Sequence, residues 1–404
     1  MPFEWFVAMR YLREGRAQTA LVLGGTTMGV AVLVFLTALI SGLQRSLVAQ
    51  TLSSQAHILV KAPERVARPL ALEAGLAADR VQRTPDRIRS VEQWQQVLEA
   101  VARMPGVVAA TPTAAGSAFA SRGEASKPVA VRGVDDETFA RVIEIGPKIR
   151  AGRFRLDGTS AVIGSVLADD LGIAVGDKLR LATPEGRGDT FVVEGIFDLG
   201  NRDVNQRWVL VPLRSAQAIL DLPGGATTIE VRVADVFAAE RIARQIERDH
   251  GLGADSWMKL NEQLLVALRS QSASSYLIQA LVVVAVALGI ASVLGVSVIQ
   301  KSREIGILRA TGTSTRRIQR IFLLEGAVVG AAGSVFGGLV GTSFAVAFAN
   351  LAKSPTGEPV FPVDLTPGLF LAAFAIAIAT GTLAAWFPAS RAARLDPAEV
   401  IRYG

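Results

Sequence analysis

The chain has 404 residues, of which 50% are hydrophobic and 19% are charged, with a formal net charge of +6. Soluble domains carry about 25% charged residues, so this composition argues against an ordinary soluble globular protein. The absence of cysteine excludes a disulfide framework and thiolate chemistry. The basic residues stand beside apolar runs, which indicates membrane topology, and we expect no nucleic-acid partner.

Residues 1–16 are predicted to form a cytoplasmic interfacial helix. Trp5, Met9 and Leu12 recur near helical spacing, and arginines occupy the other faces. A disordered terminus is the alternative. The apolar run that follows exceeds the signal-peptide core of about 7–15 residues and lacks a clear cleavage site. It is therefore interpreted as a membrane span.

Four apolar runs are long enough to cross a hydrocarbon core of roughly 30 Å, which takes about 20 helical residues. Lipid offers the backbone no hydrogen-bond partner, and none of the runs alternates as barrel strands do. The fold class is therefore predicted to be an α-helical membrane protein with a large α+β extracytoplasmic domain between helices 1 and 2. The predicted spans cover residues 17–43, 271–300, 318–350 and 367–388.

Residues 44–270 are expected to form the extracytoplasmic α+β domain, with a possible insertion over residues 130–224. Helical periodicity appears in three segments, Val91–Met104, Leu213–Leu220 and Val236–His250. Strand patterns are predicted at Val107–Ala120, Pro128–Val134, Lys178–Leu181, Thr190–Phe197, Trp208–Val211 and Thr227–Val233. Pro184–Gly188 is predicted to form a hairpin turn.

The distribution of positive charge predicts the orientation of the spans. Residues 301–317, between the second and third spans, are strongly basic and should be a cytoplasmic loop. Basic residues also precede the first span and lie within the tail, residues 389–404, so both termini should be cytoplasmic. The loop over residues 351–366 and the large domain then lie on the opposite side. Contact with anionic membrane lipid would also explain the basic loop.

The third span carries a stripe of glycines at Gly333, Gly337 and Gly341. Such a stripe lets another helix approach closely, and the neighbour could belong to this chain or to a second copy. Glu325 lies near the start of the same span. A carboxylate inside a membrane indicates function by default, but this one follows Arg320 closely, and we expect it to snorkel or to pair near the interface.

The sequence lacks the motifs of several enzyme classes. No Gly-x-x-x-x-Gly-Lys-[Ser/Thr] phosphate loop, His-Glu-x-x-His pair or Gly-x-Ser-x-Gly elbow is present. The two histidines, His57 and His250, are far apart in sequence, and His57 is expected to be a packing or capping residue. We therefore predict no catalytic residue, no metal site and no cofactor bound by this chain, which is not an enzyme in its own right.

Two segments carry a resemblance to a known family. Glu304–Gly312, of sequence EIGILRATG, together with Phe322–Gly326, resembles the permease domain shared by FtsX, MacB and the LolC/LolE lipoprotein-releasing proteins. The C-terminal segment that begins Phe387-Pro388 is similar to the end of these permeases. The resemblance implies a permease of the mechanotransmission (type VII) class of ABC transporters in the bacterial inner membrane.

The resemblance also implies partners and a coupling site. A second permease subunit, identical or different, and a separate ATPase of the LolD or MacB kind are expected, with ATP and magnesium bound by that ATPase. The coupling helix would place Ile305, Ile307 and Leu308 in a groove of the ATPase, framed by Arg303, Glu304 and Arg309.

Three functions are compatible with this resemblance. Lipoprotein extraction with a periplasmic chaperone is favoured, because the opening residues and Ser53–Ile58 are similar to LolC/LolE. MacB-like export with a membrane-fusion protein and an outer-membrane channel is the alternative, and an FtsX-like signal to a cell-wall hydrolase is a further one. The candidate partner loop is polar, although it could equally be an ordinary surface loop; it contains Arg202, Asp203, Asn205, Gln206 and Arg207.

Overall fold

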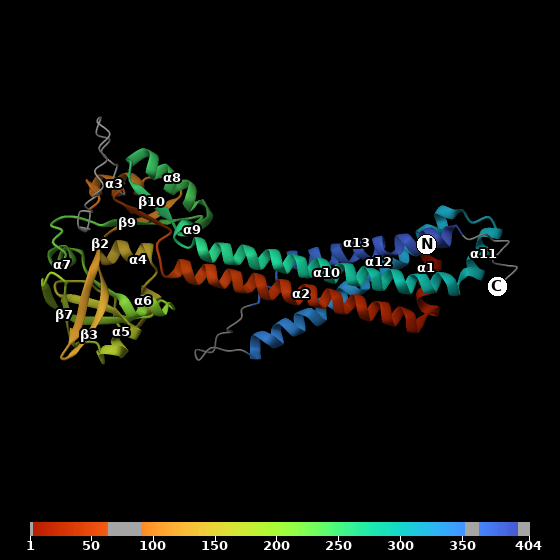
Figure 1. Ribbon diagram of the computed structural model, residues 1–404, viewed down its shortest axis with the longest axis horizontal. Coiled ribbons are helices and arrows are strands. Elements are labelled where there is room, and N and C mark those ends of the chain that lie inside the picture. The colour runs from red at the N-terminus through yellow and green to blue at the C-terminus, as the bar shows by residue number, and fades with distance from the viewer. Residues whose placement is uncertain (1–2, 64–89, 352–362, 395–404) are drawn as a thin grey trace, which may run out of the picture. The chain divides into compact units, whose positions relative to one another are not determined.

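The computed structural model describes residues 3–63, 90–351 and 363–394 (Figure 1). The chain divides into two compact units: a membrane unit, residues 1–47 and 266–404, and a strand-rich unit, residues 48–265. Parts of the predicted loop 351–366 and of the tail 389–404 lie outside the described residues.

The membrane unit is built from helices. Its described elements are α1 (Phe3–Glu14), α2 (Arg16–Ser53), α10 (Glu262–Gln300), α11 (Ser302–Ala310), α12 (Thr315–Leu351) and α13 (Pro367–Ala393). In the described part of the chain, α2, α10, α12 and α13 are long and apolar enough to cross a membrane. Proline at the first position of α13 suits a helix start, because its missing N–H would have no helical partner there.

Two of these helices extend from the membrane unit into the strand-rich unit. α2 has 38 residues and α10 has 39, so each is about 57 Å long or slightly more, against a core of about 30 Å. The boundary between the two units falls inside both helices, at Leu47/Val48 in α2 and at Leu265/Val266 in α10. Both helices thus connect the units covalently.

The glycines of α12 lie against two other helices of the same chain. A Cβ atom added at Gly337 would lie 2.6 Å from Val30 Cβ and 2.7 Å from the Thr27 carbonyl oxygen, both in α2. Gly333 and Gly341 also lie against α2, whereas Gly326 and Gly330 lie against α13. The stripe therefore packs inside the chain, and small residues allow this close approach of backbones.

The strand-rich unit contains one mixed sheet of the described strands, in the order β10-β1-β9-β2-β3-β8-β5-β7-β4, with β6 paired to β2 and β7. The strands are β1 (Ile58–Lys61), β2 (Val107–Arg122), β3 (Ala125–Val134), β4 (Ile149–Gly152), β5 (Ser160–Gly164), β6 (Lys178–Ala182), β7 (Gly188–Phe197), β8 (Trp208–Pro212), β9 (Thr228–Val233) and β10 (Gly253–Ser256). The helices are α3 (Trp94–Ala102), α4 (Asp136–Val142), α5 (Ser165–Leu171), α6 (Arg202–Arg207), α7 (Leu213–Ile219), α8 (Ala239–His250) and α9 (Trp257–Leu260), with short 3₁₀ turns at Gly146–Lys148 and Val236–Ala238.

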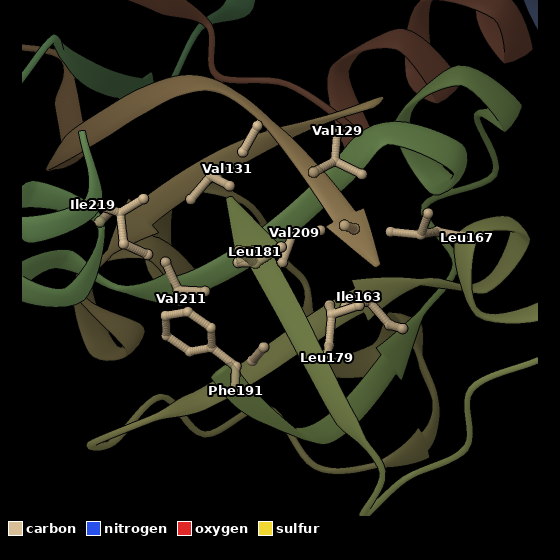
Figure 2. Close-up of a cluster of buried hydrophobic side chains, with 14 of the residues drawn as sticks. Val129, Val131, Ile163, Leu167, Leu179, Leu181, Phe191, Val209, Val211 and Ile219 are labelled. Atoms are coloured by element: carbon tan, nitrogen blue, oxygen red, sulfur yellow. The ribbon is translucent and has the colours of Figure 1, made fainter. Parts of the chain in front are cut away.

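The long strand β2 belongs to two halves of this unit. Residues 107–113 pair with β9, and residues 114–122 pair with β3. One buried core lies under β1, β9, α3 and α8, and another under β3, β5–β8, α5 and α7. Figure 2 shows the second core, where side chains from these strands and helices meet. The pairing partner of β2 thus changes between Thr113 and Ala114, and the insertion over residues 130–224 stays a prediction.

A buried ion pair connects the two halves. The Arg132 guanidinium of β3 bonds the Glu230 carboxylate of β9, and both side chains are largely buried. The same guanidinium lies 3.8 Å from the ring centroid of Trp208. Removing either charge would leave its partner buried and unpaired, which is strongly destabilising. The pair therefore favours one fixed arrangement of the two halves.

Candidate coupling site

The short helix α11 lies between α10 and α12 and begins directly after Lys301. Lys301 follows the last residue of α10 and has a non-helical backbone, and its carbonyl accepts from the Ile305 N–H of α11 at 3.0 Å. After Ala310 the chain turns at Gly312, whose φ of +94° favours glycine. The Thr313 N–H closes the turn on the Leu308 carbonyl at 3.0 Å. The helix is therefore held at both ends by its own backbone.

One face of α11 is buried in the membrane unit. Ile305 is 1% exposed and Leu308 is partly buried against the same cluster. The buried members of this cluster come from α1, α10, α12 and α13 as well as α11: Val7, Ala8, Tyr11, Val298, Ile305, Ile318, Ile321, Phe322, Ala389, Ala392 and Ala393. Ile305 and, in part, Leu308 therefore pack inside this chain, and the contact of α11 with an ATPase stays a prediction.

The opposite face of α11 is open. Arg303 and Glu304 are exposed, and Ile307 is 51% exposed. Arg309, which was predicted to frame this face, is bonded inside the chain: its Nη1 donates to the Ala393 carbonyl of α13 at 2.7 Å. Spacings of three and four residues place Arg303, Ile307 and Ala310 on one side of the helix. An apolar side chain between charged ones is available there to a partner.

Lys301, at the start of α11, contacts three groups of α1. Its ammonium lies 3.7 Å from the ring centroid of Tyr11, donates to the Tyr11 carbonyl at 3.4 Å and approaches Glu14 Oε2 to 3.7 Å. Burial, with a further contribution from nearby carboxylates such as Glu304, raises the pKa of Tyr11 to about 12. Tyr11 therefore stays neutral and contributes its ring to a cation–π contact.

Glu325 neither pairs with Arg320 nor reaches an exposed surface, contrary to the expectation that it would snorkel or pair near the interface. Glu325 is 4% exposed on the packed side of α12, whereas Arg320 is exposed, and Glu325 Oε2 has no hydrogen-bond partner within the described residues. A separation of five residues turns the two side chains to different faces of the helix.

The predicted partner loop is in fact mostly helix α6. Asn201 caps its start by accepting from the Asp203 N–H at 3.0 Å, a common role for asparagine. Asn205 is buried, and its Oδ1 accepts from the Leu199 N–H at 3.0 Å. Arg202, Asp203 and Arg207 are exposed, and Gln206 is half-buried. Asn205 therefore has a structural role, and the asparagine cap was a sequence signal that the loop interpretation missed.

Four long apolar helices and a strand-rich unit are the architecture of a multispan membrane protein with a large domain outside the membrane. Residues 19–249 match the MacB-like periplasmic core domain, and residues 276–397 match the FtsX-like permease C-terminal domain. The chain therefore belongs to the family of MacB-like and FtsX-like permeases.

Several proteins are similar to this chain over nearly its whole length. The lipoprotein-releasing system transmembrane protein LolC of Neisseria meningitidis is 24% identical, covering 99% of each chain. LolE of Haemophilus influenzae is 24% identical over 98% of each. The macrolide export ATP-binding/permease protein MacB of Hyphomonas neptunium is 25% identical, covering 98% of this chain but 60% of that protein.

The crystal structure of the periplasmic region of MacB from Actinobacillus actinomycetemcomitans gives a TM-score of 0.35 at 10% identity, covering 53% of this chain and 94% of that one. A likeness this slight carries no argument of its own.

Proposed function

We propose that this chain is a permease subunit of an ABC transporter in the bacterial inner membrane that releases lipoproteins. The observation that carries the proposal is the end-to-end match. LolC and LolE relatives are covered over 98–99% of their length, whereas the MacB relative is covered over 60%. The likeness to LolC and LolE supports a permease subunit that works with an ATPase on a separate subunit.

The open face of α11 is the proposed docking site for that ATPase. Arg303 and Glu304 offer charges of both signs around Ile307, whose side chain would be buried by a partner. Apolar anchors surrounded by polar residues are typical centres of binding interfaces. ATP and magnesium would be held by the partner, and the expectation that this chain binds no cofactor stays a prediction.

Movement of α11 has a route into the long helices. Its inner face packs against α1, α12 and α13, and Arg309 bonds α13 directly. Lys301 joins α11 to the end of α10. A shift of α11 caused by closure of the ATPase would therefore displace several packed helices together, as rigid elements that share one interface do.

Polar contacts tie α10 to α2 at three levels. Gln18 donates to Gln300 Oε1 at 2.7 Å, Gln279 donates to Thr37 Oγ1 at 3.0 Å, and Gln44 donates to Ser272 Oγ at 2.8 Å. Figure 1 shows the two helices running side by side. Such interhelical hydrogen bonds stabilise helix pairs in lipid. We infer that α2 and α10 move as one lever and carry the displacement toward residues 48–265.

The side of α10 away from α2 is the proposed contact for acyl chains and for the second permease subunit. Leu277, Leu281 and Leu288 are exposed apolar side chains on this side. Each CH₂ group removed from water is worth about 0.8 kcal/mol, so an acylated protein is held firmly in a bilayer. Extraction would need shelter for the chains, which this face of α10 would give, and work from ATP hydrolysis on the partner ATPase.

The orientation proposed is the one predicted from charge, with α11 and both termini in the cytoplasm and residues 48–265 in the periplasm. A lipoprotein chaperone would then receive the cargo there. The exposed residues of α6, Arg202, Asp203 and Arg207, stay the proposed contact for that chaperone.

The test is reconstitution of the permease, its ATPase and a triacylated lipoprotein in liposomes. We expect ATP-dependent transfer of the lipoprotein to a soluble chaperone. MacB-like export is the second candidate, because MacB relatives also match 98% of this chain. Absence of release, together with co-purification of a membrane-fusion protein, would favour it. Co-purification of a cell-wall hydrolase alone would favour the signal relay.

A further inference from the structure

A groove of about 620 Å³ lies on the membrane unit where α1, α12 and α13 meet. Its lining is Glu4, Trp5, Arg320, Leu323, Leu324, Ala327 and Thr382. The four residues of α12 recur at i, i+3, i+4 and i+7, so they form one continuous stripe along the helix. The groove is therefore a strip of apolar wall with a cation at the end nearest the start of α12.

The charge at this end is positive and available. The guanidinium of Arg320 is exposed and forms no hydrogen bond or ion pair within the described residues. Glu4 also lines the groove, but its carboxylate lies 3.7 Å from Arg317 Nε. Because Arg317 offsets Glu4, the groove presents net positive charge to a ligand.

Trp5 marks the depth of the groove in the membrane. Its side chain is partly exposed beside the charged end, and tryptophan is enriched at the level of lipid headgroups. In the orientation proposed above, this end faces the cytoplasmic leaflet, whose surface is negative because of anionic lipids.

We propose that this groove binds an anionic phospholipid of the cytoplasmic leaflet. The phosphate lies against Arg320, and one acyl chain lies along Leu323, Leu324 and Ala327. The inference goes beyond the proposed transport function, because this lipid is a resident ligand of the inner leaflet and not the cargo. It rests only on the orientation of the membrane unit.

A zwitterionic lipid with the same chains would contact the same wall but gain less from Arg320. One cationic side chain near an anionic lipid surface gives a preference of about fivefold. Selectivity between headgroups therefore separates a defined site from the general coat of lipid around any membrane protein.

The experiment measures lipid binding to the full-length permease in complex with its ATPase, in detergent, by native mass spectrometry. The probes are phosphatidylglycerol and phosphatidylcholine with identical acyl chains. We expect the intact protein to prefer phosphatidylglycerol about fivefold, Arg320→Gln to lose this preference and Arg320→Lys to keep it. Arg316→Gln is the matched control, since it removes an exposed charge one turn earlier without touching the groove.

A second variant tests the apolar part of the site. Leu324→Trp should fill the groove and lower the occupancy of both lipids. The proposal is overturned if Arg320→Gln and Arg316→Gln reduce the preference equally, or if neither does. Because lipid counting does not depend on lipoprotein release, failure here leaves the transport proposal standing, and loss of release with intact lipid preference does the reverse.

Discussion

Two isoleucines of α11, two positions apart, have opposite environments. Ile305 is 1% exposed inside the cluster shared with α1, α12 and α13, whereas Ile307 is 51% exposed. Substitutions at these two positions therefore separate the internal packing of the permease from its contact with a partner.

Ile307→Asp should abolish stimulation of the ATPase while leaving the permease folded. A charge in the centre of an apolar contact removes an anchor of the interface, and we expect at least a tenfold weaker association. The measurement is the ATPase rate as the permease is titrated. Thr315→Asp is the control, because it adds the same charge at an exposed position next to α11. Equal stimulation by Ile307→Asp and Thr315→Asp would refute the docking site.

Ile305→Ala should instead act on stability. Truncating a buried isoleucine costs about 2–5 kcal/mol, because contacts are lost and a cavity remains. Thermal unfolding of the purified permease should show a clearly lower midpoint than for Ile307→Ala, which removes an exposed side chain. Midpoints lowered to the same extent by the two variants would mean that α11 does not face inward as described.

His57 should make part of the strand-rich unit sensitive to acid. Burial lowers the pKa of His57 below its ordinary value of 6.5, and the Val233 N–H donates to its Nδ1 at 3.2 Å. A lowered pKa in the folded state means that the stabilisation is present above pH 6.5 and is lost as the pH falls through the folded-state pKa.

The measurement is hydrogen exchange of β9 in the full-length chain between neutral and acidic pH. Protection should weaken on acidification in the parent protein. In His57→Asn, an amide oxygen can accept the same bond and carries no proton, so this pH dependence should disappear. An unchanged profile in the variant would exclude His57 as the titrating group.

At the scale of elements, neighbouring glycines of α12 should respond differently to a methyl group. A Cβ at Gly337 would press on Val30 and Thr27, whereas a Cβ at Gly338 would lie 3.6 Å from Phe370, an ordinary contact. Gly→Ala otherwise favours a helix by about 1 kcal/mol. We therefore expect Gly337→Ala to lower the thermal midpoint of the permease and Gly338→Ala to preserve or raise it. Destabilisation by Gly338→Ala alone would contradict the α2–α12 packing.

The long helices could be predicted from the sequence, because lipid leaves an apolar run of this length no other regular structure. The short strands β1, β4 and β10 could not, since four residues carry too little alternation and their partners are distant in the chain. The inward position of Ile305 was missed for a related reason. Its neighbours belong to α1, α12 and α13, and no local pattern in α11 reports them.

The partner segment shows a different limit. A polar stretch between two strands was interpreted as a loop, but the side chains of Asn201 and Asn205 accept hydrogen bonds from nearby backbone N–H groups. Asparagine favours such bonds at helix starts and turns. Polarity alone therefore did not distinguish a loop from a short capped helix, and a partner contact of its exposed residues stays a prediction.

At the scale of the whole molecule, the proposed ATPase contact on α11 would act on residues 48–265 through helices. α2 and α10 are each longer than a bilayer is thick, are joined by three side-chain hydrogen bonds and continue into the strand-rich unit. The membrane-spanning helices need no catalytic group to do this work, only packing tight enough to move together.

The central claim is that α11 and residues 48–265 lie on opposite sides of the membrane. The chain has no cysteine, so single cysteines report without background. Ile307→Cys and Glu124→Cys, both at exposed positions, would be treated with a membrane-impermeant maleimide in intact spheroplasts and after permeabilisation. The account predicts that Glu124→Cys reacts in both and Ile307→Cys only after permeabilisation. Reaction of both cysteines in intact spheroplasts would contradict it.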